Sequence, residues 1–247
     1  MEFISAQASS TDIFCLQEIS YIAPHHLDQA DKSFGDAFFH DLVAALPEFK
    51  PYFVATHERF NWRPVTTDMS FGNAIFVKKT LRVVEDGHVF VHRVKNDYIL
   101  SELVEKNWYT LPRLVQYVRI ADENGVETTI YNFHGLWHKE GKGDIPARIE
   151  QAKKIRELLD ATKGRKILCG DFNLDIRNES LTTIEGSMRN LIKEFGIQTT
   201  RSKTHYSKID RMPYADYTLV SSDIEVQNFS VPNLSISDHL PMILEFV

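Results

Sequence analysis

Apolar and polar positions along this chain follow two periodicities, one typical of strands and one typical of helices. Ile13–Leu16 and Lys166–Cys169 are short apolar runs followed at once by polar residues, and each predicts a buried strand. Alternating positions and turn residues predict the remaining strands. These lie at Pro51–Ala55, Asn73–Val77, Arg82–His92 (a strand or hairpin), Leu114–Ile120, Glu127–Phe133, Ala215–Val220, Ile224–Phe229 and Pro241–Phe246.

Three stretches repeat their apolar residues at helical spacing. Phe34–Leu46 is followed by a proline, which favours the end of a helix there. Asp144–Lys163 is the clearest helix, with Asp144 as its expected N-cap. Leu181–Phe195 predicts another helix that stops at the following glycine.

Strands separated by helices predict an α/β fold in which helices cover sheets. No repeat of solenoid period and no linker rich in proline, glycine or serine divides the chain. We therefore expect residues 1–247 to form one domain. The polar residues that follow several strands indicate a site at the edge of a sheet.

Composition supports a folded protein and limits its partners. The chain has 28 basic and 34 acidic residues among 247, a formal net charge of −6, and 43% hydrophobic residues. These values exclude collagen-like, low-complexity and disordered classes. The acidic balance argues against a protein that coats duplex nucleic acid, although an enzyme can handle phosphates locally with the help of metal ions.

The sequence has neither a disulfide framework nor a membrane-spanning or leader segment, and this determines the expected cellular location. The only cysteines are Cys15 and Cys169, so no disulfide framework is expected and a reducing compartment is favoured. No apolar run of about 18 residues and no basic-then-apolar leader occurs. We therefore expect a cytoplasmic monomer without stable insertion into a membrane.

Carboxylates and histidines stand at or beside the predicted strand ends. Glu18, Asp171 and Asp238 offer the oxygen ligands that Mg²⁺ prefers. His134 and His239 could stabilise or protonate phosphate oxygens near such an ion. A single aspartate at a strand end is more often a turn residue than a ligand, so only the order of the whole set is informative.

Five motifs follow one another in an order that resembles the endonuclease/exonuclease/phosphatase superfamily. They are Gln17-Glu18, His134, Gly170-Asp171-Phe172-Asn173, Asp216-Tyr217 and Ser237-Asp238-His239. The resemblance extends over nearly the whole chain. It implies a four-layer α/β sandwich, with two mostly antiparallel sheets packed face to face and helices outside.

The resemblance also implies roles for the acidic motif residues. Glu18 looks like the main ligand of Mg²⁺, with Mn²⁺ as an alternative ion, and Asp238 looks like a second-metal or water-mediated ligand. Asp171 and Asn173 look like the pair that orients and activates the attacking water. Hydrolysis of a phosphodiester requires such an in-line water and neutralisation of the phosphoryl oxygens.

The remaining candidates concern protons and substrate. His134 looks like the family histidine that contacts or protonates a phosphate oxygen. His239 looks like the catalytic histidine, with Asp216 as the carboxylate that orients it and holds one tautomer. Asn73 and Arg113 resemble an asparagine that lines the cleft and an arginine near the phosphate, so both are candidate substrate-binding residues. A turn asparagine explains Asn73 equally well, and for Arg113 a place near the phosphate is the less favoured interpretation.

Two aromatic groups lie in predicted loops. Phe60-Asn61-Trp62-Arg63 and Asn107-Trp108-Tyr109 could stack on a base or on a hydrophobic leaving group. They could equally be loop anchors, and we favour anchors. Arg148, near the start of the long helix, is interpreted equally well as a family residue or as a solvated arginine.

The resemblance breaks down upstream of Glu18. Family members begin with a strand whose asparagine contributes to the metal site, whereas Met1–Ser9 predicts the end of the following helix and supplies no such asparagine. A missing N-terminal stretch, a site with fewer ligands and a loss of activity would each explain this, and we favour the first. If the strand is absent, an exposed edge should remain in one sheet.

The sequence therefore predicts a Mg²⁺-dependent hydrolase that cleaves phosphodiesters, with nucleic acid as the first-guess substrate. One alternative is a phosphomonoesterase or a hydrolase of phospholipids or inositol phosphates. Another is a catalytically impaired scaffold of the same fold that is used for binding. The joint presence of the acidic and histidine motif residues argues against the scaffold.

Overall fold

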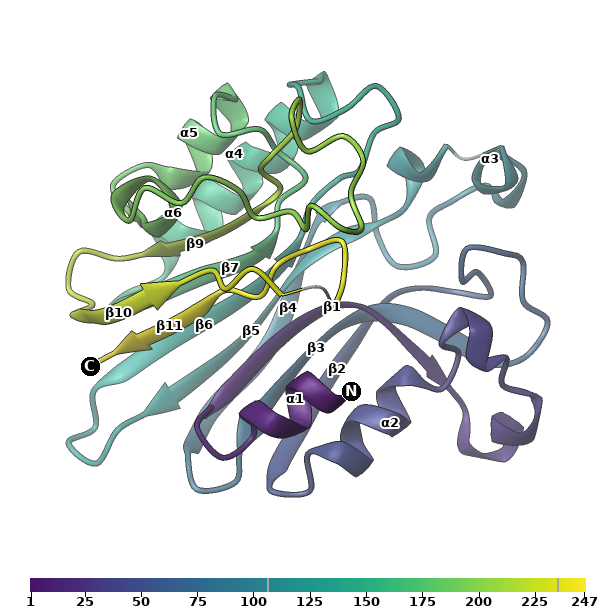
Figure 1. Cartoon of the computed structure of the whole chain (residues 1–247), viewed down its shortest axis with the longest axis horizontal. Coiled ribbons are helices and arrows are strands. Elements are labelled where there is room, and N and C mark those ends of the chain that lie inside the picture. The colour runs from purple at the N-terminus through teal and green to yellow at the C-terminus, as the bar shows by residue number, and fades with distance from the viewer. Residues whose placement is uncertain (106, 235) are drawn as a thin grey trace.

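The computed structural model describes residues 1–105, 107–234 and 236–247 and shows an α/β fold of mixed sheets and helices (Figure 1). The α/β class predicted from the sequence is therefore confirmed. One antiparallel sheet of this part of the chain contains, in order, β1 (Ile13–Ile22), β3 (Met69–Lys78) and β2 (Phe49–Glu58). The largest sheet contains β4 (Arg82–His92), β5 (Arg113–Ala121), β6 (Glu127–His134), β7 (Arg165–Asp171), β9 (Asp216–Val220) and β8 (Arg189–Asn190), and β10 (Val226–Ser230) pairs with β11 (Ile243–Phe246).

Side chains of β3 alternate between two faces. Those on one face pack against the largest sheet, and those on the other face pack against a helix that covers the three-stranded sheet. Ile75 points to the main core, where it shares a cluster with Phe133 of the largest sheet. Its neighbour Phe76 points the other way and packs with Leu42 of α2 (Phe38–Ala45). Successive side chains of a strand face opposite sides, so an apolar β3 holds both layers together.

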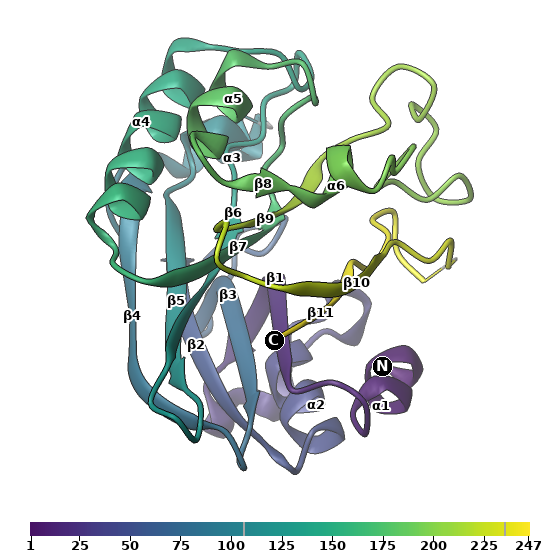
Figure 2. The same ribbon diagram turned by 90° about the vertical axis from the view of Figure 1, so that its left-hand side faces the viewer.

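Helices lie outside the sheets (Figure 2). Figure 2 shows α4 (Pro146–Ala161) and α5 (Glu179–Glu185) together, and α1 (Glu2–Gln7) and α2 on the opposite side of the molecule. None of the helices described is long and apolar enough to cross a membrane. The shorter helical segments are η1 (Pro24–Gln29), η2 (Lys32–Phe34), α3 (Leu100–Val104), η3 (Trp108–Thr110) and α6 (Leu191–Glu194).

The single helix predicted over Leu181–Phe195 is wrong. The structure has α5, the short strand β8 and α6 in its place. Gly186 follows α5 with a φ of +51°, in the left-handed region that favours glycine. A Cβ atom there would also lie 2.6 Å from the guanidinium of Arg156. Gly186 therefore ends the helix that the apolar spacing alone would continue.

The sequence predicted that the first strand would end at Glu18, and this prediction is wrong. Strand β1 continues to Ile22, and Glu18 occupies a bulge between Leu16 and Ile19 in the pairing with β3. Glu18 has a φ of +58°, which is uncommon for a residue other than glycine. The bulge re-aims its side chain, and Glu18 lines the main cavity. Within the described residues β1 pairs with β3 alone, so its other edge has no partner strand.

Two further local predictions are wrong. Asp144 does not cap α4, whose N-cap makes no side-chain hydrogen bond. The carboxylate of Asp144 instead accepts hydrogen bonds from the backbone N–H groups of Glu179 and Ser180, at 2.8 and 3.2 Å, and so caps α5. The Ser237-Asp238-His239 motif does not end a strand but lies in the segment between β10 and β11.

Candidate active site

Strand pairing in the largest sheet brings three motif residues to one edge. In the parallel pairing of β6 with β7, His134 lies opposite Asp171, and the antiparallel strand β9 places Asp216 opposite Asp171 on its other side. The chain then passes very close to itself. The Gly135 N–H donates to the Asp171 carbonyl at 2.6 Å, and a Cβ atom at Gly135 would lie 2.1 Å from the carbonyl oxygen of Phe172. Only glycine fits at that position.

Asp216 and His239 form a hydrogen-bonded pair. The Nδ1 atom of His239 lies 2.8 and 2.9 Å from the two carboxylate oxygens of Asp216. Its Nε2 atom lies 3.7 Å from Oδ2 of Asp171. Burial alone would lower the pKa of His239, but Asp216 and Asp171 raise it to about 9, while the adjacent Arg201 opposes that increase. The pair therefore holds the imidazole in one orientation and favours its protonated form.

Asp238 is paired with a cation. Its Oδ2 atom accepts a hydrogen bond from Nη2 of Arg201 at 2.7 Å, and the same guanidinium contacts Nε2 of His239. Arg201 is buried and lies over the ring of Tyr206, with 3.9 Å between the guanidinium carbon and the ring centroid. A fixed positive charge therefore stands beside the histidine.

Glu18 lies among acidic neighbours. The Nε2 atom of His134 is 3.8 Å from Oε1 of Glu18 and 4.0 Å from Oδ2 of Asp171. Burial and the nearby Asp171 raise the pKa of Glu18 to about 6. Within the described residues, Glu18 and Asp238 do not share one tight cluster of ligand atoms. Asp171, Asp216 and His239 form the group of three at this site whose ligand atoms all lie within 4.8 Å of one another.

Asn173 is held beside Asp171 by its own backbone and by a lysine. It has a φ of +55°, its N–H donates to Oδ1 of Asp171 at 2.8 Å, and its Nδ2 donates to the Gly135 carbonyl at 3.2 Å. The Nζ atom of Lys142 donates to Oδ1 of Asn173. Burial lowers the pKa of Lys142, while the carboxylate of Asp171 opposes this. The site thus contains a buried lysine close to the Asp–Asn pair.

Cations around Asp171 keep this carboxylate ionised, whereas His134 is neutral. Burial alone would raise the pKa of Asp171, but the charges of Lys142 and His239 hold it well below its usual range. Burial and the charge of Arg113 lower the pKa of His134 well below its usual range. Asp171 is therefore ionised at neutral pH, and His134 can form hydrogen bonds without a charge of its own.

The two candidate substrate-binding residues, Arg113 and Asn73, lie in different parts of the structure. Arg113 is 4% exposed and lines the main cavity, and its Nε atom has no partner among the described residues. Burial lowers its pKa to about 10, so it stays positive at neutral pH. Asn73 is buried in β3, where its Nδ2 lies 3.4 Å from the Asn132 carbonyl, and it does not line that cavity. The structure therefore brings Arg113 to the site and leaves Asn73 in the core.

The sequence did not predict Lys142 or Arg201. Lys142 stands between two glycines, in Gly141-Lys142-Gly143, and that spacing in a loop before a helix was an available signal. Arg148 is buried and donates to three backbone carbonyls in this part of the chain, so it anchors the loop that carries Lys142. Arg201 has no comparable local signal, because only its tertiary bridge with His239 brings it here.

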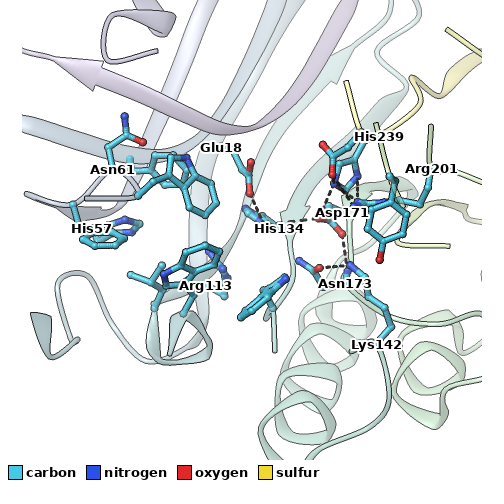
Figure 3. A pocket seen from close by; sticks show the side chains of 18 residues that line it. Glu18, His57, Asn61, Arg113, His134, Lys142, Asp171, Asn173, Arg201 and His239 are labelled. Atoms are coloured by element: carbon cyan, nitrogen blue, oxygen red, sulfur yellow. Dashed lines mark hydrogen bonds and ion pairs between the residues drawn. The ribbon is translucent and has the colours of Figure 1, made fainter. Parts of the chain in front are cut away.

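One cavity of about 210 Å³ is lined by Glu18, Arg113, His134, Lys142, Asp171, Asn173, Arg201, Asp238 and His239 (Figure 3). Figure 3 shows His239, Arg201 and Lys142 at one end, which we term the polar end. His57 and Asn61 lie at the opposite end, which we term the aromatic end. The tryptophans that line this cavity are Trp62, Trp108 and Trp137.

The site combines an Asp–His pair, ionised carboxylates and buried cations at one edge of a sheet. Such groups suit the hydrolysis of a phosphoester. A model of the Endonuclease/Exonuclease/phosphatase family matches residues 2–239. The chain therefore belongs to this family, and the resemblance drawn from the order of its motifs is confirmed. Members of the family are phosphoesterases and nucleases, so the chain is an enzyme of that class.

Solved structures of the family share this fold. A mannosyl-6-phosphatase from Bacteroides thetaiotaomicron is 20% identical, with a TM-score of 0.65 over 100% of this chain and 91% of the other. The catalytic domain of human Nocturnin with bound sulfate is 17% identical, with a TM-score of 0.63 over 100% and 86%. Truncated TDP2 from Caenorhabditis elegans is 17% identical, with a TM-score of 0.59 over 97% and 87%. A comparison with curated proteins finds no match.

Proposed function

We propose that the chain is a single domain that hydrolyses phosphodiester bonds with the help of Mg²⁺, and that its substrate is a nucleic acid. The observation that carries the proposal is the pair of Asp216 and His239, with Nε2 of His239 3.7 Å from Asp171. A fixed, protonated imidazole and an ionised carboxylate thus lie side by side, and such a pair can supply an acid and a base to a reacting phosphate. The outer helices and facing sheets support the four-layer sandwich of this family.

Glu18 and Asp238 are the residues that we propose as ligands of Mg²⁺, with Mn²⁺ as an alternative. Their carboxylates suit a hard cation, which commonly takes one or two of them together with water and phosphate oxygens. Burial and a neighbouring carboxylate raise the pKa of Glu18 to about 6, so a cation beside it would favour its ionised form. When bound, such an ion neutralises charge on the phosphoryl oxygens.

We assign the remaining catalytic roles to side chains around the proposed ion. Asp171 stays ionised at neutral pH, so we assign it to orient the attacking water and to take its proton, with Asn173 fixing the other side of that water. His239 in its protonated form donates to a phosphoryl oxygen, and Asp216 stabilises that form. His134 offers a neutral hydrogen bond to the same group.

Buried cations complement the charge of the phosphate. Arg113, Lys142 and Arg201 line the cavity with little exposure. A guanidinium or ammonium removed from water interacts strongly with a phosphoryl oxygen, because the local dielectric is low. Lys142 and Arg201 therefore place the phosphate at the polar end, and Arg113 lies between that end and the aromatic one.

Activity of two site variants tests the proposal. Asp171→Ala and His239→Ala should each lower Mg²⁺-dependent cleavage of a short oligonucleotide by about 100-fold or more, the usual scale for a proton-transfer residue. The matched controls are Asp86→Ala and His88→Ala, which lie on the exposed strand β4 and should keep full activity. Removing divalent ions with EDTA should abolish turnover, and Mg²⁺ or Mn²⁺ should restore it. Unchanged turnover in both site variants, with circular dichroism showing a folded protein, refutes the assignment.

A phosphomonoesterase is the second candidate. The concentration of buried cations at the polar end favours it, because a monoester carries more negative charge than a diester. One structural relative is a mannosyl-6-phosphatase, although that likeness extends only to the fold. Turnover of an oligonucleotide, mannose 6-phosphate and an inositol phosphate by the same preparation separates the two candidates.

A further inference from the structure

Asn61 carries a buried acceptor without a partner. The residue has no exposed surface and lines the cavity, and within the described residues its Oδ1 atom makes no hydrogen bond. Its Nδ2 donates to the Phe34 carbonyl at 3.0 Å and to Oδ1 of Asp36 at 2.9 Å. Both of those partners only accept, so the amide orientation is fixed by chemistry. The oxygen is thus the atom that remains for a ligand, and a buried acceptor is unfavourable until a donor reaches it.

The loop that carries Asn61 is held in place by contacts within the chain. Asp36 is 1% exposed and also accepts Nη2 of Arg63 at 2.8 Å. The Arg63 guanidinium lies over the ring of Phe34 at 4.3 Å, and the Asn61 N–H donates to the Arg63 carbonyl at 2.9 Å. A group held in this way loses little conformational entropy when it binds a ligand.

Trp62 presents an aromatic surface next to this acceptor. It has a φ of +56°, which is uncommon for a bulky residue, and 43% of its surface is exposed. Its indole meets that of Trp108 edge to face, with 4.8 Å between ring centroids. Trp108 is tied down by the hydrogen bond from its Nε1 to the Leu103 carbonyl at 3.2 Å. Trp108 is therefore the anchor, whereas the strained and exposed Trp62 is suited to stack on a ligand.

The histidine at the aromatic end is uncharged, and the aromatic end belongs to the same cavity as the polar end. His57 is 1% exposed, and burial together with the charge of Arg113 lowers its pKa to about 3, so it is neutral at physiological pH. Arg113 also interacts with the charges of Glu18 and Asp171 at the polar end, and Figure 3 shows it between the two ends. One ligand can therefore reach both ends, with its phosphate at one and an uncharged flat group at the other.

We propose that the aromatic end is a nucleobase site, in which Trp62 stacks on the face of the base and Asn61 Oδ1 accepts one of its N–H groups. This rests on the proposed function, since the phosphate of the same nucleotide then lies at the polar end. A hexose also stacks on tryptophan, but its several hydroxyl groups would lose water against these aromatic walls with few partners to replace it. A base has apolar faces and few edge donors, which this set of side chains matches.

Binding without metal tests the base site directly. Tryptophan fluorescence should report stacking, because Trp62, Trp108 and Trp137 all line the cavity. AMP should bind at least about 10-fold more tightly than ribose 5-phosphate, and about 10-fold more tightly than purine riboside 5′-monophosphate, which lacks the exocyclic amine. Equal binding of AMP and ribose 5-phosphate, or tighter binding of mannose 6-phosphate, would overturn the base site.

Variants assign the preference to the proposed side chain. Trp62→Ala should remove most of the preference for AMP over ribose 5-phosphate, and Trp62→Phe should restore part of it. The control is Phe195→Ala, which changes an aromatic residue of similar exposure outside the cavity and should leave the preference intact. A full preference in folded Trp62→Ala protein would also overturn the proposal. Inorganic phosphate should compete with AMP; an intact base preference without that competition would contradict the proposed phosphate site and leave the base site standing.

Discussion

Protonation of His57 should destabilise the fold in mild acid. Its pKa is lowered from 6.5 to about 3, mainly by burial and further by the charge of Arg113. The unfolded chain takes up a proton near pH 6.5, whereas the folded protein resists this until about pH 3. The stability that the neutral ring contributes is therefore complete above pH 6.5 and is lost progressively as the pH falls toward 3.

The size of this effect follows from the two pKa values. Linkage gives a loss of about 2 kcal/mol in the free energy of unfolding between pH 8 and pH 5, and of about 5 kcal/mol below pH 3. The side chain is 1% exposed, so solvent screening does little to reduce these values. Because single domains are commonly stable by about 5–15 kcal/mol, a loss of this size is easily measured.

Urea denaturation at pH 8 and pH 5 is the assay, with His57→Phe as the test variant. Phenylalanine keeps a ring beside Phe71, whose centroid lies 5.2 Å from that of His57, but it cannot titrate. Between the two pH values the wild-type protein should lose about 2 kcal/mol more stability than His57→Phe. His88→Phe, at an exposed position, should behave as the wild type does. Equal losses in wild type and His57→Phe would refute the view that folding keeps this histidine neutral.

Other substitutions probe the polar end. Asp216→Asn should lower kcat by about 100-fold with a small change in KM, because the histidine loses its orienting carboxylate; an unchanged kcat contradicts this role. Lys142→Met should shift the acidic limb of the pH–rate profile to higher pH, since the lysine helps to hold the pKa of Asp171 low; an unmoved limb contradicts it. Gly135→Ala should destabilise the protein by about 2 kcal/mol in thermal unfolding, because its Cβ would lie 2.1 Å from a carbonyl oxygen, whereas Gly143→Ala, with nothing within 4 Å, should be neutral.

Residues carried at strand ends were predictable from the sequence. His134, Asp171 and Asp216 each adjoin an apolar run, and the pairing of β6, β7 and β9 sets them side by side. An apolar run and the polar residue at its end are neighbours in sequence, so a local pattern locates them together. The order of the motifs then distinguished them from ordinary turn residues.

Residues placed by irregular backbone were not predictable in the same way. Glu18 was identified, but its bulge was not, because a single left-handed residue leaves no trace in hydrophobic periodicity. Gly186 ends a helix whose apolar spacing continues past it. Arg201 reaches the site only through long-range pairing of loops, and local periodicity carries no information about such contacts.

One buried threonine connects the two halves of the Asp–His pair. The hydroxyl of Thr200 accepts the backbone N–H groups of Ala215 and Asp216, at 3.0 and 3.2 Å, at the start of β9. Its carbonyl accepts the N–H of Leu240 at 2.9 Å, directly after His239. The carboxylate stands at a strand end and the imidazole in a loop, so their separation depends on this junction. Because Thr200 has no exposed surface, its hydrogen bonds do not compete with water, and they connect the segment that carries His239 to the start of β9.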